Sequence, residues 1–371
     1  MVAPVYLDYN AGAPVRPEVA RAMAEALTDA GNPASVHRFG RAARRRLEDA
    51  REAVAALAGA RPPQVVFTSG GTEANNMALR GHGARRVLVS AVEHDSVLKA
   101  VPKAERLPVD AQGRVSLAAL ESRLAADPRP ALVSVMLANN ETGVRQPVAD
   151  IAACAHRHGA RVHCDAVQAA GKIPLDPAAL GVDLMTLSAH KLGGPQGVGA
   201  LLVLDDAPVE AYLHGGGQER GFRAGTENLA GIVGFGAAAA AAADEVGRWA
   251  DIAAWRDRLE RDAVAQVPGA VVHGAGAERL PNTSCLGRPG VSAEVQLMAL
   301  DMAGVAVSSG AACSSGKVQP SHVLAAMGVA PEAAGEAIRV SFGWASRAAD
   351  LDRFLAAWTR LAPGERAPAA A

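Results

Sequence analysis

The sequence lacks the features that mark membrane-spanning, exported or disulfide-linked proteins. No window reaches the roughly 18 uncharged apolar residues that a spanning helix needs. The first residues, MVAPVYLDYNAGAP, show no basic segment followed by an apolar one, so a secretory signal is not expected. Only four cysteines occur in 371 residues, and none forms a C-x-x-C pair. Such sparse cysteines do not build a disulfide framework, so we expect a soluble protein of the reducing cytoplasm.

The sequence also lacks an excess of charge of either sign. Lysine and arginine number 37 against 38 aspartates and glutamates, so no basic field attracts nucleic acid or an anionic membrane. Neither G-x-x-x-x-G-K-[ST] nor G-x-G-x-x-G occurs, which speaks against a nucleoside triphosphate or a dinucleotide. No metal site is expected, because His156 and His158 are two apart on a predicted helix and face different sides. Small-molecule chemistry is the favoured class of function.

What the sequence does contain is an alternation of apolar, strand-like runs with alanine-rich helical stretches. The runs are VVFTS (65–69), RVLVSA (86–91), ALVSVML (131–137), RVHCDA (161–166), LMTLSA (184–189) and GALLVL (199–204). This alternation predicts a mainly parallel sheet covered by helices. From about 237 to 266, an Ala/Arg/Asp/Glu pattern predicts one extended helix that leads into a second region.

Lys191 is the first candidate for chemistry. It lies in SAHKLGGPQGVGALLV, directly after a predicted strand and before a glycine-rich turn. Functional groups gather at the carboxyl ends of strands in open α/β sheets. A lysine that is desolvated there can act as an amine nucleophile. The alternative is a solvated loop lysine, against which the neighbouring Ser188 and His190 and the features below count.

An anion-binding helix start is predicted in VVFTSGGTEANNMAL. There a strand is followed by Gly70, Gly71 and Thr72, and then by a helix with Glu73 in its first turn. Glycines allow close approach of the backbone, and the free amides and the helix dipole favour a phosphate. A purely structural turn is the alternative.

Asp165 follows the strand-like residues of RVHCDAVQAAGK, with Gln168 three positions later. A carboxylate at a strand end needs a cationic partner. If the ligand is a pyridinium ring, Asp165 keeps the ring nitrogen protonated and makes the ring an electron sink. An aspartate that caps a helix is the alternative.

Two further polar residues follow predicted strands. His94, in SAVEHDSV, is suited to stack on a ring or to shuttle protons, and a structural histidine is the alternative. Asn140, in MLANNETG, is suited to bind a ring oxygen, and a turn asparagine is the alternative.

Cys313 is the cysteine that the sequence places to react. It lies in VSSGAACSSGKVQPSHV, a stretch too small and polar for a core, whereas Cys154, Cys164 and Cys285 occupy patterns typical of packing residues. Arg339, in AIRVSFG, is a candidate to bind a substrate carboxylate with both of its terminal nitrogens. A surface salt bridge is the alternative for this arginine.

Taken together, a set of motifs in this order over nearly the whole chain resembles the cysteine desulfurases. The motifs are YLDYNAGAP, GNPASVHRFGR, SGGTEANN, VEHDSV, ANNETG, HCDAVQ, SAHKLGGPQGVGAL, RAGTEN and SSGAACSSG. The last is similar to the long SSG-x-AC loop of the NifS- and IscS-like group. The resemblance implies the class V, fold-type-I architecture of transferases that depend on pyridoxal 5′-phosphate (PLP). It also implies a large domain (12–250) with a mainly parallel seven-stranded sheet, and a smaller α+β domain (1–11 and 251–371).

The resemblance also implies roles for individual residues. Lys191 would be joined to PLP, His94 would stack on the ring, Asp165 would pair with the pyridinium nitrogen, and Gln168 and Asn140 would contact the ring oxygen. Four residues would hold the phosphate, with Thr226 of RAGTEN reaching over from the second subunit of a homodimer. Those four are Gly71, Thr72, Ser188 and His190.

The implied reaction is the removal of sulfur from L-cysteine. Lys191 would take the Cα proton, and the Cys313 thiolate would attack the substrate sulfur, giving L-alanine and a persulfide for an iron–sulfur scaffold or another acceptor protein. Two departures stand out: DYNAGAP replaces the usual DNNATT, and the sequence ends with LAPGERAPAAA, without the tail that docks a scaffold. Three rivals stay open: an aminotransferase, a selenocysteine lyase and a non-catalytic scaffold of the same fold.

Overall fold

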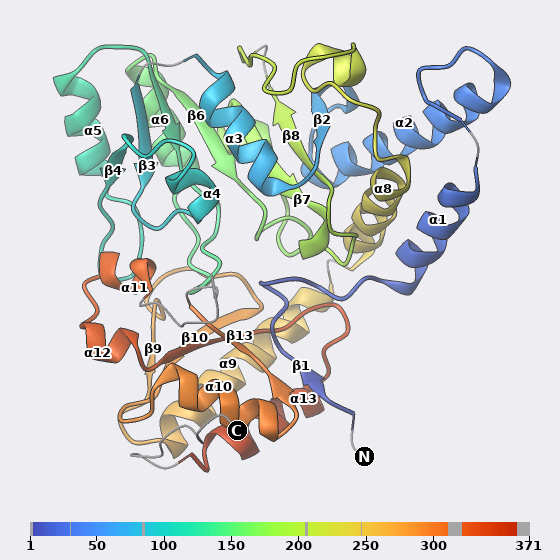
Figure 1. Ribbon diagram of the computed structural model, residues 1–371. Helices are drawn as coiled ribbons and strands as arrows, with labels where there is room; N and C mark the ends of the chain where they lie inside the picture. Colours follow the sequence, from blue (N-terminus) through green and yellow to red (C-terminus); the bar gives the residue numbers. More distant parts are fainter. Residues whose placement is uncertain are drawn as a thin grey trace, which may run out of the picture.

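The computed structural model describes residues 3–29, 31–83, 86–204, 207–245, 247–310 and 321–361. Within these ranges the chain forms two layers, one above the other in Figure 1. The upper layer is built on a large sheet and the lower layer on two small ones.

The large sheet has seven strands in the order β2-β8-β7-β6-β5-β3-β4. Their bounds are β2 Val65–Thr68, β3 Arg86–Ser90, β4 Glu105–Leu107, β5 Ala131–Ser134, β6 Arg161–Asp165, β7 Leu184–Ser188 and β8 Gly199–Val203. All neighbours pair in parallel except β8, which is antiparallel to both β2 and β7. The mainly parallel sheet and all six predicted strands are confirmed. The sequence did not predict β4, because its three residues include the charged Glu105 and Arg106.

Helices cover both faces of this sheet, as its buried, apolar strands require. They are α1 Pro17–Thr28, α2 Arg38–Ala58, α3 Gly71–Gly81, α4 Asp95–Leu98, α5 Leu117–Ala126, α6 Val148–Arg157, α7 Pro177–Leu180 and α8 Leu229–Asp244. The short 3₁₀ turns are η1 Pro62–Gln64, η2 Ala189–Lys191 and η3 Gln218–Gly221. Helix α8 packs closely on α2, since a Cβ added at Gly236 would lie 2.6 Å from the Cα of Ala50.

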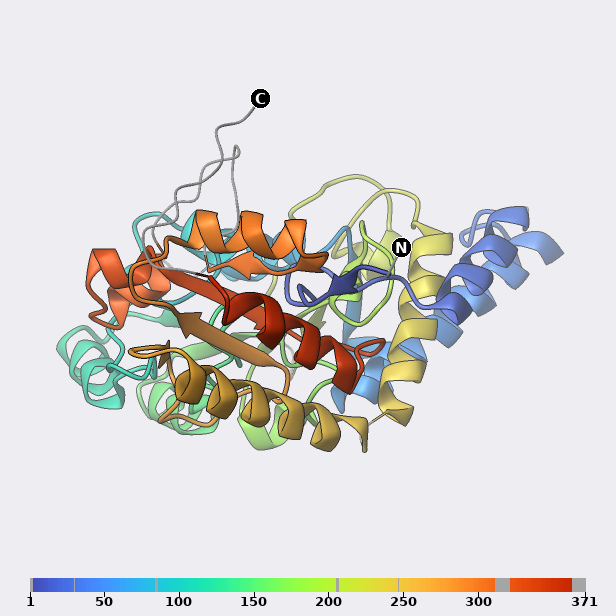
Figure 2. The ribbon, with the colours of Figure 1, turned by 90° about the horizontal axis from the view of Figure 1, so that it is seen from below.

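The lower layer contains a four-stranded antiparallel sheet and a two-stranded parallel one. The first has the order β12-β13-β10-β9 and the second pairs β1 with β11. The strand bounds are β1 Val5–Tyr6, β9 Val271–Val272, β10 Thr283–Gly287, β11 Val305–Ala306, β12 Ser308–Ser309 and β13 Ala337–Ser341. The helices are α9 Arg248–Gln266, α10 Ala293–Met302, α11 His322–Ala326, α12 Pro331–Ala334 and α13 Ala348–Trp358. Figure 2 shows α13 between α9 and α10.

The prediction of one extended helix over 237–266 is wrong. Helix α8 ends at Asp244 and α9 begins at Arg248. Glu245 leaves the helix and its carboxylate accepts hydrogen bonds from both terminal nitrogens of Arg16, at 2.9 and 2.7 Å. This ion pair and the glycine at 247, a poor helix former, account for the break.

The division into a large domain (12–250) and a small one (1–11 and 251–371) stays a proposal. Two separate hydrophobic clusters support it. One surrounds the seven-stranded sheet and includes Phe67 and Phe235, and the other lies in the lower layer around Phe342 and Trp358.

Within the described ranges, no single helix has both the length and the apolar composition to cross a membrane, although α8 and α9 taken together as a bent pair do.

Candidate active site

The polar residues that the sequence singled out gather at one edge of the large sheet. Strands β3, β5, β6 and β7 are parallel, so their carboxyl ends meet at the same edge, which faces the lower layer (Figure 1). His94 follows β3, Asn140 follows β5, Asp165 ends β6, and Ser188 ends β7 three residues before Lys191. The predicted convergence of these residues at strand ends therefore matches the topology.

Lys191 is the last residue of η2, and its side chain is partly buried. Its Nζ donates hydrogen bonds to the main-chain oxygens of Asn10, at 2.5 Å, and Ala11, at 2.9 Å. Burial and the nearby Arg339 guanidinium together lower the pKa of Lys191 to about 8, against the opposing charges of Asp8 and Asp165. The amine therefore becomes neutral much closer to physiological pH than an ordinary lysine, as a nucleophile or base requires.

Asp165 is 7% exposed. Its Oδ2 accepts a hydrogen bond from Asn75 Nδ2 at 2.8 Å, and its Oδ1 accepts one from the Val167 N–H at 3.0 Å. No helix begins at the residues that follow, so the alternative of a helix-capping aspartate fails. Both described donors are neutral, and a buried carboxylate is costly without a cationic partner, so this group is suited to a ligand that carries a proton on nitrogen.

At the start of α3, three main-chain N–H groups lie before the first helical hydrogen bond. The first helical hydrogen bond of α3 runs from Ala74 N–H to Gly70 O, so the N–H groups of Gly71, Thr72 and Glu73 precede it. A Cβ added at Gly71 would lie 3.5 Å from Ser188 Cβ, which places the β7 end beside this helix start. The site can receive an anion there.

Ser188 and His190 form a hydrogen-bonded pair beside the helix start, with 2.8 Å between Oγ and Nδ1. Burial lowers the pKa of His190 to about 4, and the charges of Lys191 and His94 act in the same direction. His190 is therefore neutral at physiological pH and offers hydrogen bonds rather than charge.

His94 caps α4, because its Nδ1 accepts a hydrogen bond from the Ser96 N–H at 3.1 Å. Since Nδ1 accepts, a neutral ring carries its proton on Nε2. Ser96 Oγ lies 2.8 Å from the same nitrogen and also accepts a hydrogen bond from Asn75 Nδ2 at 2.9 Å. Asn75 thus connects His94 to Asp165. Nδ1 of His94 therefore has a structural role, because it caps the helix. The ring itself is exposed and can stack on a ligand.

The side chain of Gln168 and the main chain of Asn140 both form hydrogen bonds with Asn10. Gln168 Nε2 donates to the main-chain oxygen of Asn10 at 3.0 Å, and the main-chain oxygen of Asn140 accepts from Asn10 Nδ2 at 3.1 Å. Their predicted contact with a ring oxygen stays a prediction.

Arg339 is not the surface arginine of the alternative reading, because it is 4% exposed. One terminal nitrogen lies 2.8 Å from Asp8 Oδ1, and the other donates to the Asn140 main-chain oxygen at 3.1 Å. Its buried Nε has no described partner. The guanidinium is therefore held in place near Lys191, which suits the binding of a substrate carboxylate.

The comparisons with known proteins decide the family. The aminotransferase class-V model matches residues 5–354. A cysteine desulfurase of Cereibacter sphaeroides is 47% identical over 95% of this chain and 94% of its own length. An IscS-like cysteine desulfurase of Mycobacterium tuberculosis is 41% identical over 94% of each chain. The NifS-like protein of Rickettsia africae superposes with a TM-score of 0.89 at 34% identity, covering 96% of this chain and 98% of that one. The chain belongs to the cysteine desulfurases.

Two of the expected residues of this cysteine desulfurase are not tested by its geometry. Cys313 lies in 311–320, outside the described residues. Thr226 is exposed before α8, and its predicted role requires a second chain, so it stays a prediction. The other three cysteines, Cys154, Cys164 and Cys285, are free and buried. This agrees with the expected packing role of Cys164 and Cys285, whereas Cys154 Sγ also donates a hydrogen bond to Glu121.

The sequence did not predict Lys172, Asn75 or the central part played by Asn10. Lys172 is 4% exposed, and its Nζ donates to Gln168 O at 2.9 Å and Gln168 Oε1 at 3.1 Å. Burial, together with the charges of Lys191 and Arg339, lowers its pKa to about 7. One signal was available for Asn75: it comes four residues after Gly71 on α3, the spacing of one helical face.

Proposed function

We propose that this cysteine desulfurase removes sulfur from L-cysteine with PLP joined to Lys191, and that it carries the sulfur as a persulfide on Cys313. The observation that carries the cofactor assignment is Asp165. It is a buried carboxylate at the edge of the large sheet where the candidate residues gather, and its described partners are neutral N–H groups. Its negative charge therefore favours a protonated ring nitrogen. The family consists of PLP enzymes, which supports the same assignment.

The donor set fits the rest of this cofactor. The free amides of Gly71 and Thr72, together with Ser188 and His190, suit its phosphate, and His94 presents a ring for stacking. Asn140 and Gln168 would face its ring oxygen, and Thr226 of a partner subunit would complete the phosphate site. When bound, PLP supplies the electron sink that makes the substrate Cα–H acidic.

Lys191 is the proposed base. Its lowered pKa leaves a substantial neutral fraction near physiological pH, and that amine takes the proton from the substrate Cα. Lys172 is proposed as a positioning residue for this step. Its amino group shares Asn10 with that of Lys191. Burial and the charge of Lys191 lower the pKa of Lys172, so Lys172 holds Asn10 in place while the positive charge stays on Lys191.

Arg339 is the proposed holder of the substrate carboxylate. Its hydrogen bonds to Asp8 and to the Asn140 carbonyl fix the guanidinium in one position. Substrate binding then costs little conformational entropy of the arginine side chain.

Cys313 is the proposed sulfur acceptor. Its thiolate attacks the substrate sulfur, so an S–S bond forms as the substrate C–S bond breaks. The products are L-alanine and the Cys313 persulfide, with no external oxidant or reductant. Burial of the other three cysteines supports this assignment, since it raises the pKa of Cys164 and Cys285, and that of Cys154 to about 11.

We further propose a homodimer. Three apolar side chains on α1, on α2 and between them are exposed: Leu27 at 73%, Val36 at 88% and Phe39 at 50%. Large apolar side chains left exposed to this extent are consistent with a protein interface. A cytoplasmic location, and an iron–sulfur scaffold or related acceptor of the sulfur, rest on the resemblance and the sparse cysteines.

The test is formation of L-alanine from L-cysteine without any keto acid. Desulfuration predicts alanine in proportion to the sulfur released, whereas transamination predicts no turnover until a keto acid is added. Selenocysteine is supplied in parallel; a reaction restricted to it would contradict the proposed substrate. Light scattering of the same holoenzyme measures the dimer.

A further inference from the structure

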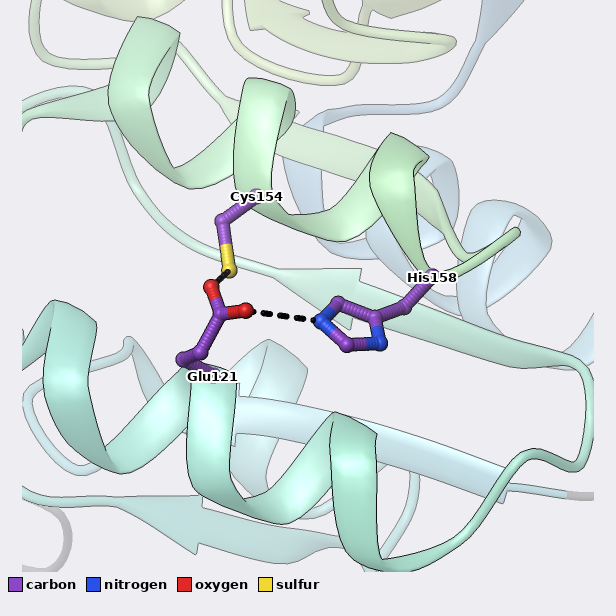
Figure 3. A group of neighbouring side chains, drawn as sticks. All are labelled: Glu121, Cys154 and His158. Atoms are coloured by element: carbon purple, nitrogen blue, oxygen red, sulfur yellow. Dashed lines mark hydrogen bonds and ion pairs between the residues drawn. The ribbon is translucent and has the colours of Figure 1, made fainter.

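Glu121, Cys154 and His158 form a compact group away from the candidate active site (Figure 3). Glu121 extends from α5, Cys154 from the last turn of α6, and His158 from the residue directly after α6. Cys154 Sγ donates to Glu121 Oε2 at 3.0 Å, and His158 Nε2 lies 3.0 Å from Glu121 Oε1. One ligand atom from each residue lies within 4.8 Å of the other two.

The spacing on α6 explains why the sequence did not predict this group. His156 and His158 are on different sides of the helix, as expected, but Cys154 and His158 are four apart and share one face. That face meets Glu121 on the neighbouring helix, as Figure 3 shows. His156 faces elsewhere and its Nε2 lies 3.0 Å from Asp183 Oδ2.

Sulfur, imidazole nitrogen and carboxylate oxygen are the donor types that Zn²⁺ takes in proteins. Three protein ligands leave the fourth tetrahedral position for water. Cys154 is buried, whereas the Glu121 side chain is 49% and that of His158 24% exposed, so the group has an open side through which an ion can enter.

The charges allow a divalent cation here. The two carboxylate oxygens of Glu121 face the Cys154 sulfur and the His158 ring, so the group offers an acidic side chain to a cation. The Cys154 thiol donates its proton to the Glu121 carboxylate, and a zinc ion would displace that proton as the Sγ–Zn bond forms. The competing cation is Arg157, 3.0 Å from Glu121. Its side chain is 63% exposed and can turn into solvent, because an exposed ion pair contributes little.

The group is remote from the chemistry of the enzyme. His158 lies just before the start of β6, whereas Asp165 ends that strand at the site edge. A metal ion at this place would therefore connect α5 to α6 without touching Lys191.

We propose that Glu121, Cys154 and His158 form a zinc site, with a water molecule as fourth ligand, that connects helices α5 and α6.

The test uses untagged holoenzyme that carries Cys313→Ser, so that the loop thiol cannot bind the metal. Zinc chloride and, separately, cobalt chloride are titrated in at neutral pH. The proposal predicts about one tightly bound ion per chain, one proton released per zinc ion, and red ligand-field bands of tetrahedral Co²⁺, where PLP does not absorb.

Cys154→Ser and His158→Gln, each added to this background, should weaken zinc binding by at least the 10–100-fold that loss of an outer ligand contact costs. His156→Gln is the matched control, because it removes a histidine from the same helix and should leave binding unchanged. Circular dichroism checks that each variant folds. Absence of stoichiometric zinc binding in the parent, or equal binding in the Cys154 and His158 variants, overturns the proposal.

Discussion

Lys172 and Lys191 both donate hydrogen bonds to Asn10. The Nζ of Lys191 lies 2.5 Å from the main-chain oxygen of Asn10, and that of Lys172 lies 3.5 Å from its side-chain oxygen. Two amines held by one residue cannot both be charged without repulsion, which supports the proposed role of Lys172. The five predictions that follow test this relationship and the roles of Asp165, Cys313 and Lys191.

Lys191→Ala should raise the pKa of Lys172, because the substitution removes a positive charge that, beside burial, lowers it. The measurement is the pH titration of the Lys172 amine by NMR of the PLP-free protein with labelled lysine. Lys191→Arg keeps the charge and is the control, with a smaller expected change. An unaltered Lys172 titration in Lys191→Ala would show that the two amines do not act on each other.

The buried Lys172 should also make stability depend on pH. Its pKa is lowered to about 7 in the folded chain, from about 10.4 in an unfolded one. Between these values the unfolded chain binds more protons, so the free energy of unfolding rises with pH, by up to about 1.4 kcal/mol per unit, and is lost as pH falls toward 7. Urea unfolding at pH 7, 8 and 9 should show this slope in the wild type relative to Lys172→Met. A free energy of unfolding that changes with pH to the same extent in both proteins would contradict this prediction.

Asp165→Asn should weaken both cofactor binding and catalysis. The amide cannot keep a ring nitrogen protonated, so we expect kcat to fall by about 100-fold or more and the visible PLP absorbance to change. Asp183→Asn is the control, since Asp183 precedes β7 at the opposite edge and pairs with Arg161. Wild-type activity and spectrum in Asp165→Asn would refute the assigned role.

Cys313→Ser should bind PLP and L-cysteine normally but form neither alanine nor persulfide. The serine hydroxyl cannot accept sulfur, so a single turnover followed by quantification of both products separates binding from transfer. Cys285→Ser is the matched control, because Cys285 is buried in β10. Alanine formation at the wild-type rate in Cys313→Ser would remove Cys313 from the mechanism.

Much of the sheet was predictable from local patterns, because buried strands are continuous apolar runs with turn residues between them. The candidate residues after β3, β5, β6 and β7 followed from the same logic, since parallel strands bring their carboxyl ends together. Lys191 and Asp165 were therefore placed at one edge without any knowledge of contacts.

The connections between distant segments were not predictable. Asn10 precedes Lys172 by more than 160 positions, and no periodicity shows that its two oxygens serve different lysines. The break between α8 and α9 depends on Glu245 meeting Arg16, which also lies far away in the sequence. Glu121, the partner of Cys154 and His158, lies on another helix, and no local pattern in the sequence shows that α5 packs on α6.

The most direct test of the central claim is to fix the cofactor to its lysine with sodium borohydride and to map the modified peptide by mass spectrometry. Lys172 and Lys191 lie in different peptides and both have lowered pKa values, so the experiment discriminates between neighbours. We predict the pyridoxyl group on Lys191 alone, and no labelled peptide in Lys191→Ala. A label on Lys172, or one that persists in Lys191→Ala, would contradict the account.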